Sequence, residues 1–248
     1  MKKMRLLSLA VAAVLCSGFV SCSDDDDEPQ KSADNAANPE TDEYGIAVSQ
    51  EVDLGLSVNW ASWNVGASSP EEYGGYYAWG ETDEKYDYDE STYKWCNGRD
   101  DTLTKYCTDS DDGTVDNRTV LEPQDDVAHV KWGDGWRMPT EDELLELENN
   151  CTWTWITYNG VNGYKVTGRK LSKGNRNSIF LPAAGYHFCT SLSFAGDDGL
   201  YWSSTLNSNS SLIIDNDYAY ALSFHSNYSN IGCDSRRYGR SVRPVKEK

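Results

Sequence analysis

GLYWSSTLNSNSSLIIDNDYAYALSFHSNYSNIGCDSRRYGRSVRPV, residues 199–245, is the stretch that decides the fold. It begins with the aromatic block YWSS at 201–204 and ends with RSVRPV at 240–245. In its middle, residues 218–225 (YAYALSFH) alternate large apolar side chains with smaller or polar ones. This period of two is typical of a strand with one buried face. We therefore expect a strand that buries Tyr218, Tyr220, Leu222 and Phe224.

The composition of this stretch is also unusual. Residues 206–241 contain no Lys, Glu, Gln, Met or Trp, although Lys and Glu are common elsewhere in the chain. The residues present are largely those that AAC and AAT codons reach when only their adenines change, whereas the five missing types need a purine in the third position. Adenine-directed mutagenesis is one interpretation. The other is ordinary turn chemistry, because Asn, Ser, Asp and Gly are favoured in turns.

The N-terminus predicts export and lipid anchoring. Lys2, Lys3 and Arg5 precede an apolar run at 6–15, and FVSC at 19–22 resembles a bacterial lipobox. The apolar run is too short to span a bilayer permanently, so residues 1–21 are predicted to be a lipoprotein signal peptide. Cys22 is the expected lipidation site, and two or more acyl chains give stable anchoring.

An acidic run, SDDDDE at 23–28, follows Cys22 directly. A lipobox followed at once by Asp repeats resembles the surface-export signal of Bacteroidetes lipoproteins. It implies a lipid-anchored protein of the outer membrane that faces the cell exterior. Residues 22–47 are polar and without periodicity, so we expect an acidic flexible tether before a single domain at 48–248.

The overall charge limits the partners. The formal net charge is -18 and the isoelectric point is about 4.4. Nucleic acids and anionic membrane surfaces both attract basic proteins, so we expect no nucleic acid partner and membrane contact through the anchor alone. Aromatic residues make up 12% of the chain while long apolar runs are scarce, which favours short strands and long loops.

Cysteines and acidic loops give no metal signal. Beyond Cys16 and Cys22 the chain has five cysteines, and an oxidising exterior permits disulfides. We expect first the pairs Cys96 with Cys107 and Cys189 with Cys233. There is no CxxC or HExxH motif, and DSDDG at 109–113 departs from the EF-hand register. We predict solvated loops without metal or cofactor, and calcium in these loops is the alternative.

Two helices and several strands are expected. A short helix at 123–130 starts with a proline. A second follows Pro139, where Thr140 and Glu143 make a capping box before an apolar stripe of leucines. Strands are expected at 58–62, 153–157, 164–167 and 178–183.

Five ordered motifs carry a family resemblance. They are VDLGL at 52–56, WRMPT at 136–140, LPAAG at 181–185, YWSS at 201–204 and RSVRPV at 240–245. In this order they resemble the Fibrobacter succinogenes major paralogous domain family, which is similar to the C-type-lectin-like superfamily. The resemblance implies an α+β fold of short antiparallel strands, two helices and long loops. It also implies paired N- and C-terminal strands, with 52–56 near 242–245, and an exposed face between Trp202 and Arg240.

The resemblance further implies a binding module for recognition or adhesion. In the C-type-lectin-like variable proteins of diversity-generating retroelements, adenine-mutagenised codons lie in a similar C-terminal region. Tyr offers large contact area at low entropic cost and small polar residues adapt to a partner. The expected ligand is a protein or glycan on another cell, a phage or a host surface. The candidate ligand-binding residues are Asn207, Asn209, Ser211, Ile213, Asp215, Asn216, His225, Asn227, Tyr228, Asn230, Ile231, Asp234, Arg236, Arg237 and Tyr238.

Other functions have less support in the sequence. A calcium-dependent sugar lectin would want Glu-Pro-Asn and Trp-Asn-Asp, but the chain has EPQ at 122–124 and no Trp-Asn-Asp. Calcium-independent glycan binding without diversification stays open. An enzyme similar to formylglycine-generating enzymes would need a pair of active-site cysteines, and no such pair carries over to Cys189 or Cys233. No Ser/His/Asp set replaces it, so we do not expect an enzyme.

Overall fold

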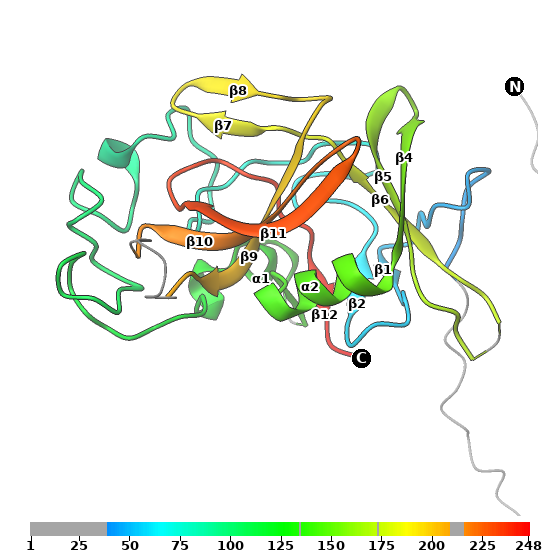
Figure 1. Ribbon diagram of the computed structural model, residues 1–248, viewed down its shortest axis with the longest axis horizontal. Coiled ribbons are helices and arrows are strands. Elements are labelled where there is room, and N and C mark those ends of the chain that lie inside the picture. The colour runs from blue at the N-terminus through cyan, green and yellow to red at the C-terminus, as the bar shows by residue number, and fades with distance from the viewer. Residues whose placement is uncertain (1–38, 134, 173, 209–215) are drawn as a thin grey trace, which may run out of the picture. The chain divides into compact units, whose positions relative to one another are not determined.

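The computed structural model describes residues 39–133, 135–172, 174–208 and 216–248 (Figure 1). The predicted signal peptide, the predicted lipidation site Cys22 and most of the predicted tether therefore lie outside the described residues, as do the candidates Asn209, Ser211, Ile213 and Asp215. In the part that is described, no helix is both long and apolar enough to cross a membrane. Ile46 and Ala47 are fully buried. The folded region thus begins before residue 48.

The described residues form an α+β fold of small antiparallel sheets. The helical elements are η1 (Glu90–Thr92), η2 (Pro123–Asp125), α1 (Val127–Trp132) and α2 (Glu141–Asn150). The strands are β1 (Glu51–Val52), β2 (Asn59–Ala61), β3 (Trp136–Arg137), β4 (Thr152–Tyr158), β5 (Val161–Thr167), β6 (Ser178–Pro182), β7 (Tyr186–Phe188), β8 (Ser191–Ser193), β9 (Gly199–Leu206), β10 (Tyr218–His225), β11 (Tyr228–Ser235) and β12 (Val245–Lys246). Their orders within sheets are β1-β2-β12-β3, β11-β10-β9, β4-β5-β6 and β7-β8.

The first sheet joins the two ends of the domain. β12 lies between β2 and β3, and Val245 is the register partner of Trp60. Val52 pairs with the same Trp60 from the other side. The C-terminal strand therefore pairs with β2, and the segment 52–56 is one strand further away than predicted.

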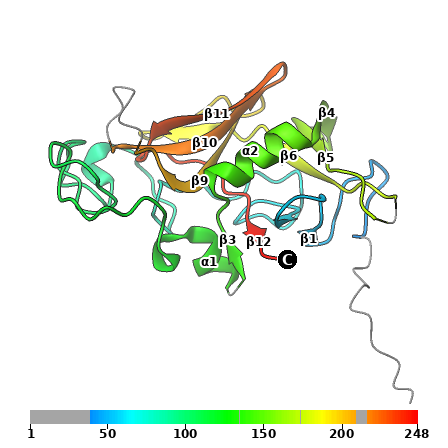
Figure 2. The same ribbon diagram turned by 60° about the horizontal axis from the view of Figure 1, so that its bottom comes forward.

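The helix α2 forms as its sequence predicts. The Thr140 side chain accepts a hydrogen bond from the Glu143 backbone N–H, and the Glu143 side chain accepts one from the Thr140 N–H. Leu144 and Leu147 are buried against the sheet of β9, β10 and β11. Figure 2 shows α2 lying along this sheet. The helix predicted at 123–130 is instead divided into η2 and α1, because the Asp126 carboxylate caps a new helix start.

The strands β9 and β10 lie between two hydrophobic cores. Tyr201, Leu222 and Phe224 belong to the core that α2 covers, whereas Trp202, Ala219 and Ala221 belong to a second core. The register between β9 and β10 shifts between Ala219 and Ala221. This shift is the mark of a β-bulge.

The prediction that all four large side chains of β10 are buried is therefore only half right. Leu222 and Phe224 are buried as predicted. Tyr218 and Tyr220 stay half-exposed, because the core under α2 ends at Leu222. The small residues Ala219 and Ala221 are the buried ones at this end of the strand.

Buried arginines connect distant segments. The Arg243 side chain is 1% exposed and donates to Asn64 Oδ1 at 2.8 Å, Ala61 O at 3.1 Å, Ser62 O at 2.9 Å and Phe180 O at 2.9 Å. It thus ties the C-terminal segment to β2 and β6. Burial lowers its pKa to about 10, because the charged form loses its hydration.

The five cysteines that the structure describes do not pair. Cys96, Cys107, Cys151, Cys189 and Cys233 are all free thiols, so the predicted pairs are wrong for this structure. The Cys96 and Cys107 thiols each donate to a carbonyl of their own loop, those of Glu90 and Asp109.

Candidate ligand-binding face

The exposed candidates gather on the β10–β11 hairpin. His225, Asn227, Tyr228 and Asn230 are all exposed. The register pairs His225 with Tyr228, whose rings stack at 5.6 Å with an interplanar angle of 27°. These side chains contribute little to either core, so they are free to contact a ligand.

The sheet register decides which β11 side chains share a face. Residues opposite each other in an antiparallel pair project to the same side. Asn230 pairs with Ser223 and Asp234 pairs with Ala219. These residues, with His225 and Tyr228, therefore project away from α2. Ile231 pairs with Leu222 and packs against the core under α2, so it lies on the opposite side.

Three other candidates are buried. Asn207 and Asn216 are 2% and 6% exposed, and Arg236 is fully buried. The Asn216 side chain accepts from Thr108 N–H and donates to Asp112 Oδ2 at 2.6 Å. Because they lie inside the protein, these three positions are removed from the candidate surface.

Arg236 has a structural role that explains its burial. It donates to Tyr93 Oη, to the carbonyls of Lys105 and Tyr106, and to Asn216 O, at distances from 2.9 to 3.1 Å. Its guanidinium also lies 4.9 Å from the ring of Trp79. Every nitrogen of this side chain therefore bonds to the protein, and it holds the loop around residues 93–106 against β11.

Arg237 and Tyr238 lie at the edge of the face. The Arg237 guanidinium is 2.7 Å from Glu90 and 3.6 Å from Asp217, and it covers the Tyr238 ring at 5.2 Å. Burial is the main reason that the pKa of Asp217 is raised to about 6. Tyr238 is half-buried and in edge-to-face contact with Phe188 at 5.4 Å.

The β7–β8 hairpin adds aromatic side chains that the sequence reasoning missed. Phe188 and Phe194 are 44% and 56% exposed. The Phe194 ring stacks on Tyr186 at 6.1 Å with an interplanar angle of 9°, and Tyr186 in turn contacts Tyr238 at 5.7 Å. Figure 1 places this hairpin beside the β9–β11 sheet, on the side away from α2. The two-residue spacing of Tyr186 and Phe188, which places both side chains on one face of a strand, was the sequence signal that could have identified this surface.

Burial shifts the pKa values of titratable groups at this surface. Desolvation is the main cause that raises the pKa of Tyr186, with Asp234, Tyr238 and Asp198 as further contributors. Desolvation also raises the pKa of Asp198, and the nearby His225 partly opposes this rise.

We call the surface formed by the aromatic side chains of the β7–β8 hairpin and the neighbouring side chains of 198–238 the binding face. Its members are Tyr186, Phe188, Phe194, Asp198, His225, Tyr228, Asn230, Asp234 and Tyr238.

A small pocket opens at one end of the binding face. Its volume is about 120 Å³. It is lined by Asp198, Leu200, Ser223, Phe224, His225 and Tyr228. We call it the Asp198 pocket. The Asp198 carboxylate and the stacked rings of His225 and Tyr228 lie together in it, where residues 197–200 pass β10 and β11.

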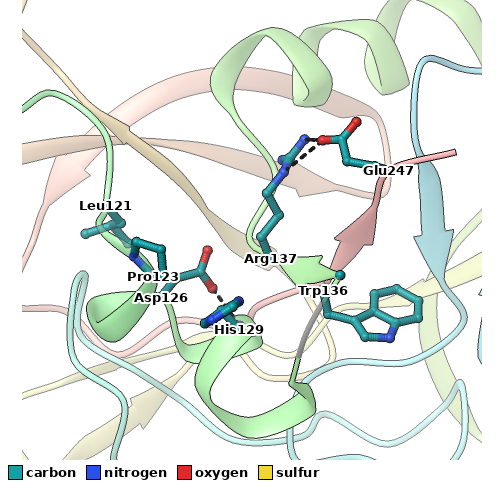
Figure 3. Close-up of a pocket in the computed structure, with 8 residues that line it drawn as sticks. Leu121, Pro123, Asp126, His129, Trp136, Arg137 and Glu247 are labelled. Carbon is teal, nitrogen blue, oxygen red and sulfur yellow. Dashed lines mark hydrogen bonds and ion pairs between the residues drawn. The ribbon is translucent and has the colours of Figure 1, made fainter.

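A larger cavity lies elsewhere, between α1, β3 and the C-terminal segment, with a volume of about 240 Å³. Figure 3 shows Arg137 and Glu247 paired on one side of it and Asp126 beside His129 on the other. All three guanidinium nitrogens of Arg137 already donate, to Glu247, Glu143 and Met138 O. The Asp126 oxygens accept three backbone N–H groups. Because these charged groups are satisfied internally, this cavity offers a ligand less than the binding face does.

The structure gives no constellation for metal chemistry. Across the described ranges, no group of three or more His, Cys, Asp or Glu side chains is placed to hold a metal ion. The Cys189 and Cys233 side chains are half-buried, and burial raises the pKa of the Cys233 thiol, so its thiolate is disfavoured.

Comparison with known proteins adds one finding. A family model described as a domain of unknown function, DUF8237, matches residues 167–245. No curated protein and no solved structure shows significant similarity to the chain. The matched segment runs from the end of β5 into β12 and contains every residue of the binding face. The chain is therefore similar to this family over the segment that carries its candidate site.

Proposed function

We propose that this chain is a surface-exposed, lipid-anchored recognition protein that binds a ligand through the binding face. One observation carries the proposal. Exposed aromatic side chains of the β7–β8 hairpin stand beside exposed polar side chains of β10 and β11, and neither set is needed by the cores. Protein surfaces that bind macromolecules combine aromatic side chains with adaptable polar ones in this way.

The proposed fold is C-type-lectin-like. Support comes from the short antiparallel strands, the two α-helices and the long irregular segment between β2 and α1. The C-terminal strand lies in one sheet with β1 and β2, as that fold would require. The anchoring at Cys22 and the outward orientation rest on the sequence of residues 1–28.

Diversification of residues 206–241 is part of the proposal and has a sharp structural consequence. Tyr228 and Asn230 are exposed and could change freely, whereas Arg236 and Asn216 hold a loop in place. A diversified repertoire should therefore vary at Tyr228 and Asn230 and keep Arg236. Sequencing this region and its neighbourhood in many isolates tests the idea. Variation spread evenly over buried and exposed positions, with no adenine bias and no template repeat, would rule it out.

Binding itself is tested with substitutions that spare the cores. Full-length protein on beads is screened against an array of glycans and an array of cell-surface proteins. The triple variant Phe188→Ser, Phe194→Ser and Tyr228→Ser should weaken binding at least about tenfold, since central aromatic contacts dominate interface energies. The matched control carries Val115→Ser and Val130→Ser. These two valines are 42% and 49% exposed and lie outside the binding face.

The two arrays separate the proposal from its alternative. Binding confined to glycans and dependent on Phe188 and Phe194 would favour a calcium-independent lectin. The parallel rings of exposed Phe194 and half-buried Tyr186 also support this option. Equal losses in the triple variant and in the valine control would show that the binding face is not the site.

A further inference from the structure

The Asp198 pocket is the right size for one side chain. Pockets that hold whole small-molecule ligands usually measure about 300–1,000 Å³, and this one measures about 120 Å³. A cavity of that size still exceeds by several times the space that one water molecule needs. The pocket therefore suits a single projecting group of a larger ligand.

The charge of the pocket is negative. Asp198 is half-buried, and its carboxylate takes part in no ion pair among the described residues. Asp197 is exposed beside it. No Lys or Arg side chain lines the pocket. Of the residues that the structure describes, His225 is the one basic side chain that lines the pocket, so any further positive group that complements Asp198 must come from outside.

The walls of the pocket favour a flat cation. The His225 and Tyr228 rings lie nearly parallel at its rim, and Tyr228 is 51% exposed. Leu200, the register partner of Ser223, supplies apolar surface on the same side of the sheet, and Ser223 supplies a hydroxyl group. A guanidinium group is planar, stacks on aromatic faces and donates in a fork that matches a carboxylate.

We propose that the Asp198 pocket binds an arginine side chain of a protein ligand, with the guanidinium on Asp198 and the side-chain stem along Leu200 and Tyr228. This assignment rests on the proposed function and makes it more specific, because it selects a protein over a glycan as the partner. The net charge of -18 is in keeping with a basic partner.

The test uses the three histidines of the chain as reporters. His225 lies in the pocket, His129 in the larger cavity, and His187 packs against Tyr76 at 4.8 Å. The full-length protein is titrated at about pH 8 with N-acetylarginine methylamide while the imidazole proton resonances are followed by NMR. N-acetylcitrulline methylamide, which has nearly the same shape and no charge, is the matched probe.

The arginine derivative should shift the His225 resonances in a saturable way, with a dissociation constant in the millimolar range, and leave His129 and His187 unmoved. Asp198→Asn should weaken this binding at least about fivefold, and Asp197→Asn should have a smaller effect. Unchanged His129 and His187 resonances in each variant show that it is folded.

Three results would overturn the proposal: no shift of His225, an equal shift with the citrulline derivative, or unchanged binding in Asp198→Asn. Each of them is compatible with ligand binding that depends on Phe188 and Phe194, so the pocket can fail while the proposed function stands. Conversely, if ligand binding on the arrays does not depend on Phe188 and Phe194 but the arginine derivative still binds, the proposed function fails and the pocket assignment stands. An equal shift with a lysine derivative would refute the preference for a planar cation.

Discussion

Replacing Arg243 by Met should destabilise the fold more than the same change at Arg240. Both side chains are fully buried, but only Arg243 has a complete set of acceptors. Arg240 pairs with Asp234 and stacks on Trp202 at 4.5 Å, while its Nε and Nη1 find no hydrogen-bond partner in the described part of the chain. Methionine fills a similar apolar volume without donors.

The expected magnitudes follow from what each change leaves behind. Arg243→Met strands four buried acceptors, at about 1–3 kcal/mol each. The cost of burying the charge disappears at the same time, so we expect a net loss of about 3–5 kcal/mol. Arg240→Met loses one ion pair with a carboxylate that is 36% exposed, and it also removes the cost of two unpaired donors. We expect about 1–2 kcal/mol or less.

Urea unfolding followed by tryptophan fluorescence measures both variants. With a slope of about 2–3 kcal/mol per molar urea, Arg243→Met should lower the midpoint by about 1–2 M and Arg240→Met by less than about 1 M. Equal midpoints for the two variants, or the reverse order, would refute the idea that the acceptors of Arg243 determine its contribution.

Three further predictions concern a turn, a carboxyl group and the thiols. Gly185 has a φ of 66° and an added Cβ would collide with the Ser193 carbonyl, so Gly185→Ala should lower the urea midpoint more than Gly133→Ala, where φ is 84° and the added atom meets open space. The pKa of Asp217 is raised to about 6, above its usual value near 4, so the folded state should gain stability as the pH falls from about 7 to 5. Asp217→Asn should remove this gain, which is about 1–1.5 kcal/mol over that range, and identical pH dependences of the two proteins would contradict the assignment. Denatured, unreduced protein should titrate with Ellman's reagent for all five thiols of the described domain, and three or fewer would indicate a disulfide.

Local sequence signals predicted the parts of the fold that depend on neighbouring residues. The capping box of Thr140 and Glu143 acts within one helical turn, and the predicted strands around 153–157, 164–167 and 178–183 became β4, β5 and β6. Such elements are set by period and by caps. The helix at 123–130 was divided because the Asp126 carboxylate competes for the same backbone groups.

The candidate site was predicted less well, because exposure depends on partners distant in sequence. Arg236 was assigned to the ligand-binding surface because it lies in the polar segment 206–241, but Tyr93, Lys105 and Tyr106 come from a separate loop to bury it. The opposite error concerns Phe188 and Phe194, which the sequence did not identify as surface residues. Phe188 lies in β7 and Phe194 directly follows β8, and only the tertiary arrangement leaves these two rings in solvent instead of in a core.

The position of β12 between β2 and β3 also constrains how the chain is synthesised and folded. While the ribosome is still adding residues, β2 and β3 have no strand to join them, and Trp60 lacks the neighbour that Val245 will provide. Contacts between residues so far apart in sequence form slowly, since a long loop must close first. Nascent chains of this protein should therefore be unable to join β2 to β3 until β12 has been synthesised.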